Sequence, residues 1–90
     1  MNLSSHAQIR MQQRGISARV VKWLQDYGRH TPDHRKGTIV HFDRRSKQKL
    51  RQALPSKALA KYDKQLDAYL IMTDGQVVTV GHRYKRIRNP

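Results

Sequence analysis

The chain has 90 residues and a formal net charge of +13, because 19 Lys and Arg residues stand against 6 acidic residues. A chain this short can bury one core, so we expect a single domain over residues 1–90. It has no cysteine, which excludes disulfides, zinc–cysteine sites and thiol nucleophiles. No apolar run approaches the length of a membrane span or of an export signal. We therefore expect a basic domain in the cytoplasm with no membrane partner.

Two helices are predicted at the start of the chain. Ser5 to Gln8 has the capping-box pattern, in which a serine caps a helix and a glutamine three residues later reaches back, so the first helix is expected to begin at Ser5. Gly15 is its expected end, because glycine readily adopts the left-handed conformation that closes a helix. Ser17 is expected to cap a second helix over residues 18–27, whose apolar residues recur at helical spacing.

The middle of the chain is expected to hold a hairpin and a short helix. Residues 38–42 are mainly β-branched and aromatic, and we expect them to pair with a first strand near Arg29 to Pro32. Ser46 is expected to cap a short helix that ends near Pro55. Residues 56–66 are expected to be helical or irregular.

A second hairpin is expected near the C-terminal end. Asp74-Gly75 is a strong turn signal, and predicted strands at residues 69–72 and 77–80 flank it. The whole pattern predicts an α+β fold, in which two N-terminal helices pack on an antiparallel sheet of about four strands. A short helical insertion precedes the C-terminal hairpin.

The register of this hairpin carries a chemical prediction. With a two-residue turn, Tyr69 pairs with Val80 and Asp67 pairs with His82. A carboxylate opposite an imidazole would fix the tautomer of the imidazole and raise its pKa. The alternative is a surface ion pair at a frayed strand end, and the sequence leaves both open.

His6, Arg10 and Arg14 form a basic stripe on the first helix. They are spaced four residues apart, so they lie on one slanting line beside an apolar stripe. This arrangement places an imidazole and two guanidinium groups at the rim of the core. The alternative is a solvated basic face with no further role.

The acidic residues argue against a metal site. All six are aspartates scattered along the chain, and there is no glutamate. The chain also lacks a glycine-rich phosphate loop and a nucleophile elbow. We therefore expect no metal and no cofactor, while the positive charge favours the phosphates of RNA or DNA as the target.

The residues at the two ends of the chain resemble a known family. The N-terminal motif consists of His6-Ala7, Arg10-Met11 and Arg14 to Ser17, and the C-terminal motif of Asp74-Gly75 followed by the strand Val77 to Val80. Together they resemble a small bacterial family of uncharacterised domains, grouped with the barnase/EndoU/colicin-nuclease/RelE-like fold. The resemblance implies N-terminal helices on an antiparallel sheet. Many members of this grouping are metal-independent ribonucleases, often toxins neutralised by an antitoxin.

Charge and resemblance together predict a metal-independent endoribonuclease, the toxin of a toxin–antitoxin pair, that cleaves RNA by attack of the 2′-hydroxyl group. Such cleavage requires a base, cations that hold the phosphorane charge, and an acid for the leaving oxygen. The expected catalytic residues are His6, His82, Arg14 and Arg83, and the expected substrate-binding residues are Arg10, Tyr84, Lys85 and Arg86.

Two partners are expected: RNA, either free or on the ribosome, and an acidic antitoxin protein. The alternative function is a non-catalytic basic module that binds RNA or DNA through the same residues, and a scaffold for an acidic protein is a third. Convergence of His6 and His82 at an open cleft would favour the nuclease.

Overall fold

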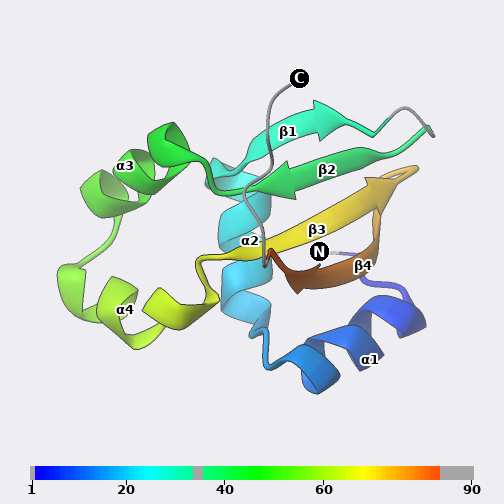
Figure 1. Cartoon of the computed structure of the whole chain (residues 1–90), viewed down its shortest axis with the longest axis horizontal. Coiled ribbons are helices and arrows are strands. Elements are labelled where there is room, and N and C mark those ends of the chain that lie inside the picture. Colours follow the sequence, from blue (N-terminus) through cyan, green and yellow to red (C-terminus); the bar gives the residue numbers. More distant parts are fainter. Residues whose placement is uncertain (1, 34–35, 84–90) are drawn as a thin grey trace.

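The computed structural model describes residues 2–33 and 36–83, which form an α+β fold of helices and a four-stranded antiparallel sheet (Figure 1). This confirms the predicted fold class. The elements in chain order are α1 (Ser5–Arg14), α2 (Ala18–Tyr27), β1 (Arg29–Pro32), β2 (Thr38–His41), α3 (Arg44–Ala53), α4 (Ser56–Lys61), the 3₁₀ helix η1 (Asp63–Gln65), β3 (Ala68–Thr73) and β4 (Gln76–His82). No helix in the described ranges is long and apolar enough to cross a membrane.

Helix α1 has Ser4 as its N-cap, not Ser5 as predicted. The hydroxyl oxygen of Ser4 accepts a hydrogen bond from the backbone N–H of Ala7 (3.0 Å). The preceding chain runs extended along β4, where the N–H of Ser4 donates to the carbonyl of Val77 (2.9 Å). Ser4 therefore already has the extended backbone that an N-cap requires. Gly15 ends the helix as expected, with a φ of 64°.

Helix α3 has Asp43 as its N-cap, where Ser46 was predicted. The carboxylate of Asp43 accepts hydrogen bonds from the backbone N–H (2.8 Å) and from the hydroxyl (2.7 Å) of Ser46. A carboxylate is the stronger acceptor, so the helix starts at Arg44 and Ser46 lies within its first turn. The prediction that Ser17 caps α2 is confirmed, since its hydroxyl accepts from the N–H of Val20 (3.3 Å).

The hairpin of β3 and β4 contains a β-bulge. Met72 pairs with Val77, but its neighbour Ile71 pairs with Thr79, so Val78 is an extra residue in β4. An extra residue displaces every pair beyond it by one position. The bulge therefore decides which residues at the end of β4 lie on each face of the sheet.

The predicted register is wrong beyond this bulge. His82 faces Ala68 instead of Asp67, and the predicted pair of Tyr69 with Val80 does not form. The physical reason is burial of apolar side chains. Val77 and Val80 are three positions apart, and the extra residue between them lets both face the same core.

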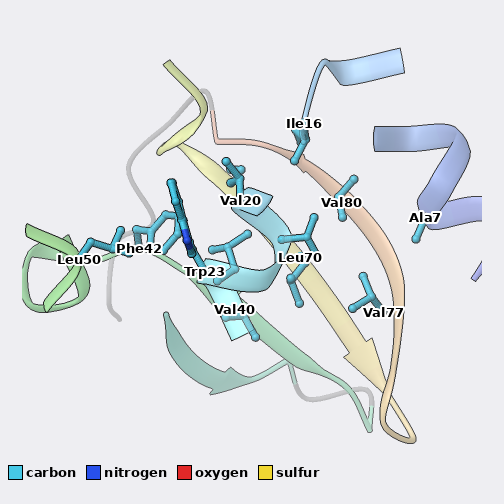
Figure 2. Packing of buried hydrophobic residues seen from close by; sticks show 13 residues of the cluster. Ala7, Ile16, Val20, Trp23, Val40, Phe42, Leu50, Leu70, Val77 and Val80 are labelled. Atoms are coloured by element: carbon cyan, nitrogen blue, oxygen red, sulfur yellow. The ribbon is translucent and has the colours of Figure 1, made fainter. Parts of the chain in front are cut away.

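The core lies between α2 and one face of the sheet (Figure 2). Val40, Leu70 and Val80 are cross-strand neighbours, so they share this face and are buried against the helix. Helix α1 contacts β4 and adds Ala7. The core residues of α2 are Val20, Val21, Trp23 and Leu24.

We name the opposite side of the sheet the helix-free face. Among the described residues, α1 and α2 are the helices that make extensive contacts with the strands, and α2 lies behind the sheet in Figure 1. Arg29, His41, Tyr69 and Gly81 form one cross-strand row, displaced by one position from the core row. Side chains alternate along a strand, so this row faces away from α2. Arg83 lies two residues beyond Gly81 and continues on the same side.

Gly28 provides a test of the packing of α2 against β2. A methyl group at this position would lie 2.7 Å from Cγ1 of Val40 and still closer to the carbonyl oxygen of Leu24, which is fixed by its bond from the N–H of Gly28. We expect Gly28→Ala to lower the free energy of unfolding by about 1–3 kcal/mol, measured by urea titration. The control is Ala60→Ser on the exposed surface of α4, with an effect below about 0.5 kcal/mol. Equal stability of the two variants would contradict this packing.

Candidate functional site

His82 connects the end of α1 to the sheet. Its Nδ1 lies 2.6 Å from Oδ1 of Asp67, and its Nε2 lies 2.6 Å from the carbonyl oxygen of Arg14. A carboxylate and a carbonyl both accept hydrogen bonds, so both ring nitrogens donate and the imidazole is cationic. We name this arrangement of His82, Asp67 and the Arg14 carbonyl the His82 clasp. The predicted contact between Asp67 and His82 is thus present, although the two residues are not cross-strand partners.

The pKa of His82 reflects these contacts. Burial lowers the pKa, but the hydrogen bonds to Asp67 and to the Arg14 carbonyl outweigh this effect, and the pKa lies above the usual histidine value. The carbonyl belongs to the last turn of α1, where the helix dipole also favours a cation. A proton held by two internal acceptors is poorly placed for transfer to a substrate.

The structure does not bring His6 and His82 together. His6 lies in the first turn of α1, whereas His82 contacts Arg14 in the last turn. Eight residues separate these positions, or about 12 Å along the helix axis. His6 is exposed and accepts a weak hydrogen bond from Nε of Arg10 (3.4 Å) at its Nε2. This geometry is that of a solvated basic stripe on the outer side of α1.

Arg83 lies in a different environment from the other predicted residues. It shares the helix-free face with His41, and its charge lowers the pKa of that histidine. Arg29 is the cross-strand partner of His41 on β1, and its charge also lowers the pKa of His41. Tyr69 is the cross-strand partner of His41 on β3. We name Arg29, His41, Tyr69 and Arg83 the His41 site.

Two buried nitrogen atoms in the His41 site have no hydrogen-bond partner. They are Nδ1 of His41 and Nε of Arg83. Among the described residues, no other buried side-chain nitrogen or oxygen atom lacks a hydrogen-bond partner. An unpaired buried polar atom costs about 1–3 kcal/mol, and such groups in a native structure call for a specific explanation. A ligand that offers oxygen atoms to both side chains would remove this cost.

His41 is held in the neutral form. Burial is the largest effect that lowers its pKa, followed by the charge of Arg83, while Asp43 raises it and Arg29 lowers it slightly. A neutral imidazole beside two guanidinium groups can accept a proton next to a bound anion. His41 therefore has the properties of a base, which His82 lacks.

Tyr69 lies against β4 because Gly81 has no side chain. A methyl group at Gly81 would lie 2.9 Å from the Tyr69 ring and 3.0 Å from its hydroxyl oxygen. The ring thus lies across β4, over Gly81. This places a hydroxyl donor on the same face as the imidazole and the guanidinium groups.

Sequence reasoning missed three members of the His41 site: His41, Arg29 and Tyr69. The pairing of Arg29 with His41 in the first predicted hairpin could have placed these two residues side by side. Tyr69 and Arg83 join them only through the register of β2, β3 and β4. Tyr84, Lys85 and Arg86, the predicted substrate-binding residues, lie outside the described residues.

Known proteins give no guide to this site, since no family model, no curated protein and no solved structure matches the chain. The family resemblance of the terminal motifs therefore stays a prediction. Within residues 2–33 and 36–83, no three or more His, Cys, Asp or Glu side chains come together as a metal site would require.

The His82 clasp predicts a specific dependence of stability on pH. Because the pKa of His82 is raised in the folded protein, its contribution to stability is fully present below the unfolded value of about 6.5. It is lost as the pH rises through the folded value. We expect His82→Gln to cost about 1–2 kcal/mol at about pH 5.5, since Asp67 is half-exposed and screened, and much less above the folded pKa.

The measurement is urea unfolding of both proteins across this pH range. Asp67→Asn should flatten the same part of the pH profile, because it removes the acceptor but keeps the histidine. His6→Gln, an exposed histidine of α1, serves as the control. A cost of His82→Gln that is the same at every pH would show that the imidazole is not a cationic clasp.

Proposed function

We propose that the protein is a metal-independent endoribonuclease that cleaves single-stranded RNA at the His41 site. The observation that carries the proposal is the pair of buried, unpartnered nitrogens of His41 and Arg83 on the helix-free face. A phosphodiester group is the ligand that fits them, because it offers acceptor oxygens to a guanidinium group and a proton-bearing 2′-hydroxyl neighbour to an imidazole. The net charge of +13 supports a polyanionic substrate.

The mechanism follows from the chemistry of these side chains. A ring nitrogen of neutral His41 takes the proton of the 2′-hydroxyl, whose oxygen attacks the phosphorus atom. Arg83 and Arg29 stabilise the charge of the phosphorane. The bond to the 5′-oxygen breaks, this oxygen takes a proton from the hydroxyl of Tyr69, and the proton on His41 returns to Tyr69 through solvent. The products are a 2′,3′-cyclic phosphate and a free 5′-hydroxyl.

This proposal keeps the predicted reaction and Arg83 but moves the proton transfer from His6 and His82 to His41. Two observations support His41 in place of the other histidines. Both ring nitrogens of His82 are hydrogen-bonded within the protein, and His82 contacts the opposite end of α1 from His6. Arg10 and Arg14 remain candidates for binding RNA outside the reacting group. The toxin–antitoxin assignment and the acidic partner rest on the family resemblance and on the basic surface alone.

Activity of His41 and His82 variants separates the two versions of the site. We expect His41→Asn to lower the cleavage rate more than about a hundredfold, as loss of a general base does, and Arg83→Gln to lower it by a similar factor. His30→Asn, an exposed histidine on the other side of β1, is the matched control and should stay within about twofold. The readout is a defined single-stranded RNA, analysed for 2′,3′-cyclic phosphate ends.

Cleavage of RNA in EDTA and of a 2′-deoxy substrate tests the proposed reaction further. Cleavage should persist in EDTA and should fail on a 2′-deoxy substrate, since internal attack needs the 2′-hydroxyl. A folded His82→Gln variant that loses more than a hundredfold while His41→Asn retains activity would overturn the proposed site in favour of the sequence-based pair. Binding without any cleavage would instead support the non-catalytic RNA-binding module.

Binding of RNA should depend strongly on salt, whether or not cleavage follows. The positive charge is not offset by any acidic block in the sequence, so binding releases condensed cations from the nucleic acid. If about six phosphates are engaged, we expect the affinity to fall several hundredfold or more between about 50 and 200 mM salt. The measurement is fluorescence anisotropy with a labelled 2′-O-methyl oligonucleotide, which cannot be cleaved. An affinity that is flat across this range would remove nucleic acid as the partner.

A further inference from the structure

A cleft of about 420 Å³ adjoins the His41 site, between the start of β1 and the first turns of α3. Tyr27 forms one wall, and Arg29, Arg45 and Lys49 contribute cationic groups. Asp43 also lines the cleft. We propose that this cleft binds one nucleotide of single-stranded RNA, adjacent to the phosphodiester held at the His41 site, with its base stacked on Tyr27 and its phosphate held by Arg45 and Lys49.

The charges of the cleft favour a phosphate over a neutral ligand. Three cationic side chains face one carboxylate, that of Asp43. This carboxylate is already engaged, since it accepts two hydrogen bonds from Ser46 and pairs with Arg29 at 3.6 Å. Arg45 and Lys49 are exposed and lie four residues apart, so they share one side of α3. Their charge is therefore available to an incoming anion.

The aromatic wall favours a nucleotide over inorganic phosphate. Tyr27 is half-buried, with part of its side chain packed on the core and part lining the cleft. Base stacking on an aromatic ring beside a cationic groove is the usual way in which proteins hold single-stranded nucleic acid without sequence preference. The bases of a duplex are already stacked on each other, so such a wall selects unpaired RNA.

The cleft and the His41 site are continuous through Arg29. This residue lines the cleft, is the cross-strand partner of His41 and acts electrostatically on it. A strand of RNA with its scissile phosphate at Arg83 and His41 can therefore pass Arg29 and place its neighbouring nucleotide in the cleft. The placement of this nucleotide next to the scissile phosphate rests on the proposed function. Binding of a nucleotide in the cleft does not itself require cleavage.

The first experiment separates the cleft from general positive charge. The double variant Arg45→Gln/Lys49→Gln removes two charges from the cleft, and Arg44→Gln/Arg51→Gln removes two exposed charges from elsewhere on α3. We expect the cleft variant to bind a 2′-O-methyl pentanucleotide about tenfold more weakly, with a salt slope reduced by about 0.7 for the lost phosphate contact. The control should lose less than about threefold with an unchanged slope. Equal losses in the two variants would overturn the proposal.

The second experiment tests the stacked base. Tyr27→Phe keeps the ring and should bind the pentanucleotide with unchanged affinity. Tyr27→Leu keeps an apolar group of similar size against the core and should lose about tenfold. On an abasic oligomer with the same number of phosphates, both variants should equal the wild type. A loss that is the same with and without bases would show that Tyr27 is a packing residue and no platform.

The outcomes distinguish this site from the proposed function. Cleft variants that bind weakly in a protein that never cleaves RNA would support the nucleotide site and refute the nuclease. Cleavage that depends on His41 but proceeds with wild-type KM in the Arg45→Gln/Lys49→Gln variant would support the nuclease and refute the nucleotide site. If Tyr27→Leu does not fold, the charge variants still decide whether the cleft holds a phosphate. The affinities of the wild-type protein for the pentanucleotide and for the abasic oligomer then decide whether a stacked base contributes, and equal affinities would refute the platform.

Discussion

The β-bulge at Val78 determines what each end residue of β4 can do. Val77 and Val80 are both buried in the core, yet they are three positions apart, and a regular strand would turn them to opposite faces. The extra residue resolves this conflict and reverses the orientation of everything that follows. His82 consequently lies on the helix side of the sheet, where it reaches the end of α1, and Arg83 lies on the helix-free face beside His41. One irregularity thus creates both the clasp and the site.

Two histidines at the same end of this small sheet have opposite shifts in pKa, and the difference follows from what surrounds them. His82 has an acceptor at each ring nitrogen and is cationic, whereas His41 is buried among guanidinium groups and is neutral. Their effects on stability oppose each other. Protonation of His41 weakens the fold as the pH falls below about 6.5, where the His82 clasp is strongest. A histidine that stabilises the fold as a cation is poorly suited to take a proton, so the same physics separates the structural role from the chemical one.

The elements of this fold could be predicted from the sequence because local signals mark them: Gly15, Ser17 and Asp74-Gly75 all act where the sequence places them. The errors lie where two local signals compete. Ser4 displaces Ser5 as the cap of α1 because the chain before the helix already runs extended along β4. Asp43 displaces Ser46 as the cap of α3 because its carboxylate is the stronger acceptor. The site was harder to predict. The sequence predicts Arg83 as a site residue, but its position beside His41 depends on the register of β2, β3 and β4. That register depends on a bulge for which the sequence of the turn gives no signal.

The few carboxylates of the chain determine where its positive charge acts. Asp67 is bound to His82, and Asp43 caps α3 while pairing with Arg29. Asp33 accepts a hydrogen bond from the backbone N–H of Gly37 at the β1–β2 turn. These aspartates are fixed by internal contacts, so they neutralise charge only at the positions they occupy. Within the described part of the chain, no carboxylate pairs with Arg83, Arg45 or Lys49, so the charge of these side chains remains available to an incoming polyanion. A net charge of +13 attracts nucleic acid at many points of the surface, so charge alone does not position a substrate, and the contacts of the His41 site and of the adjoining cleft have to do so.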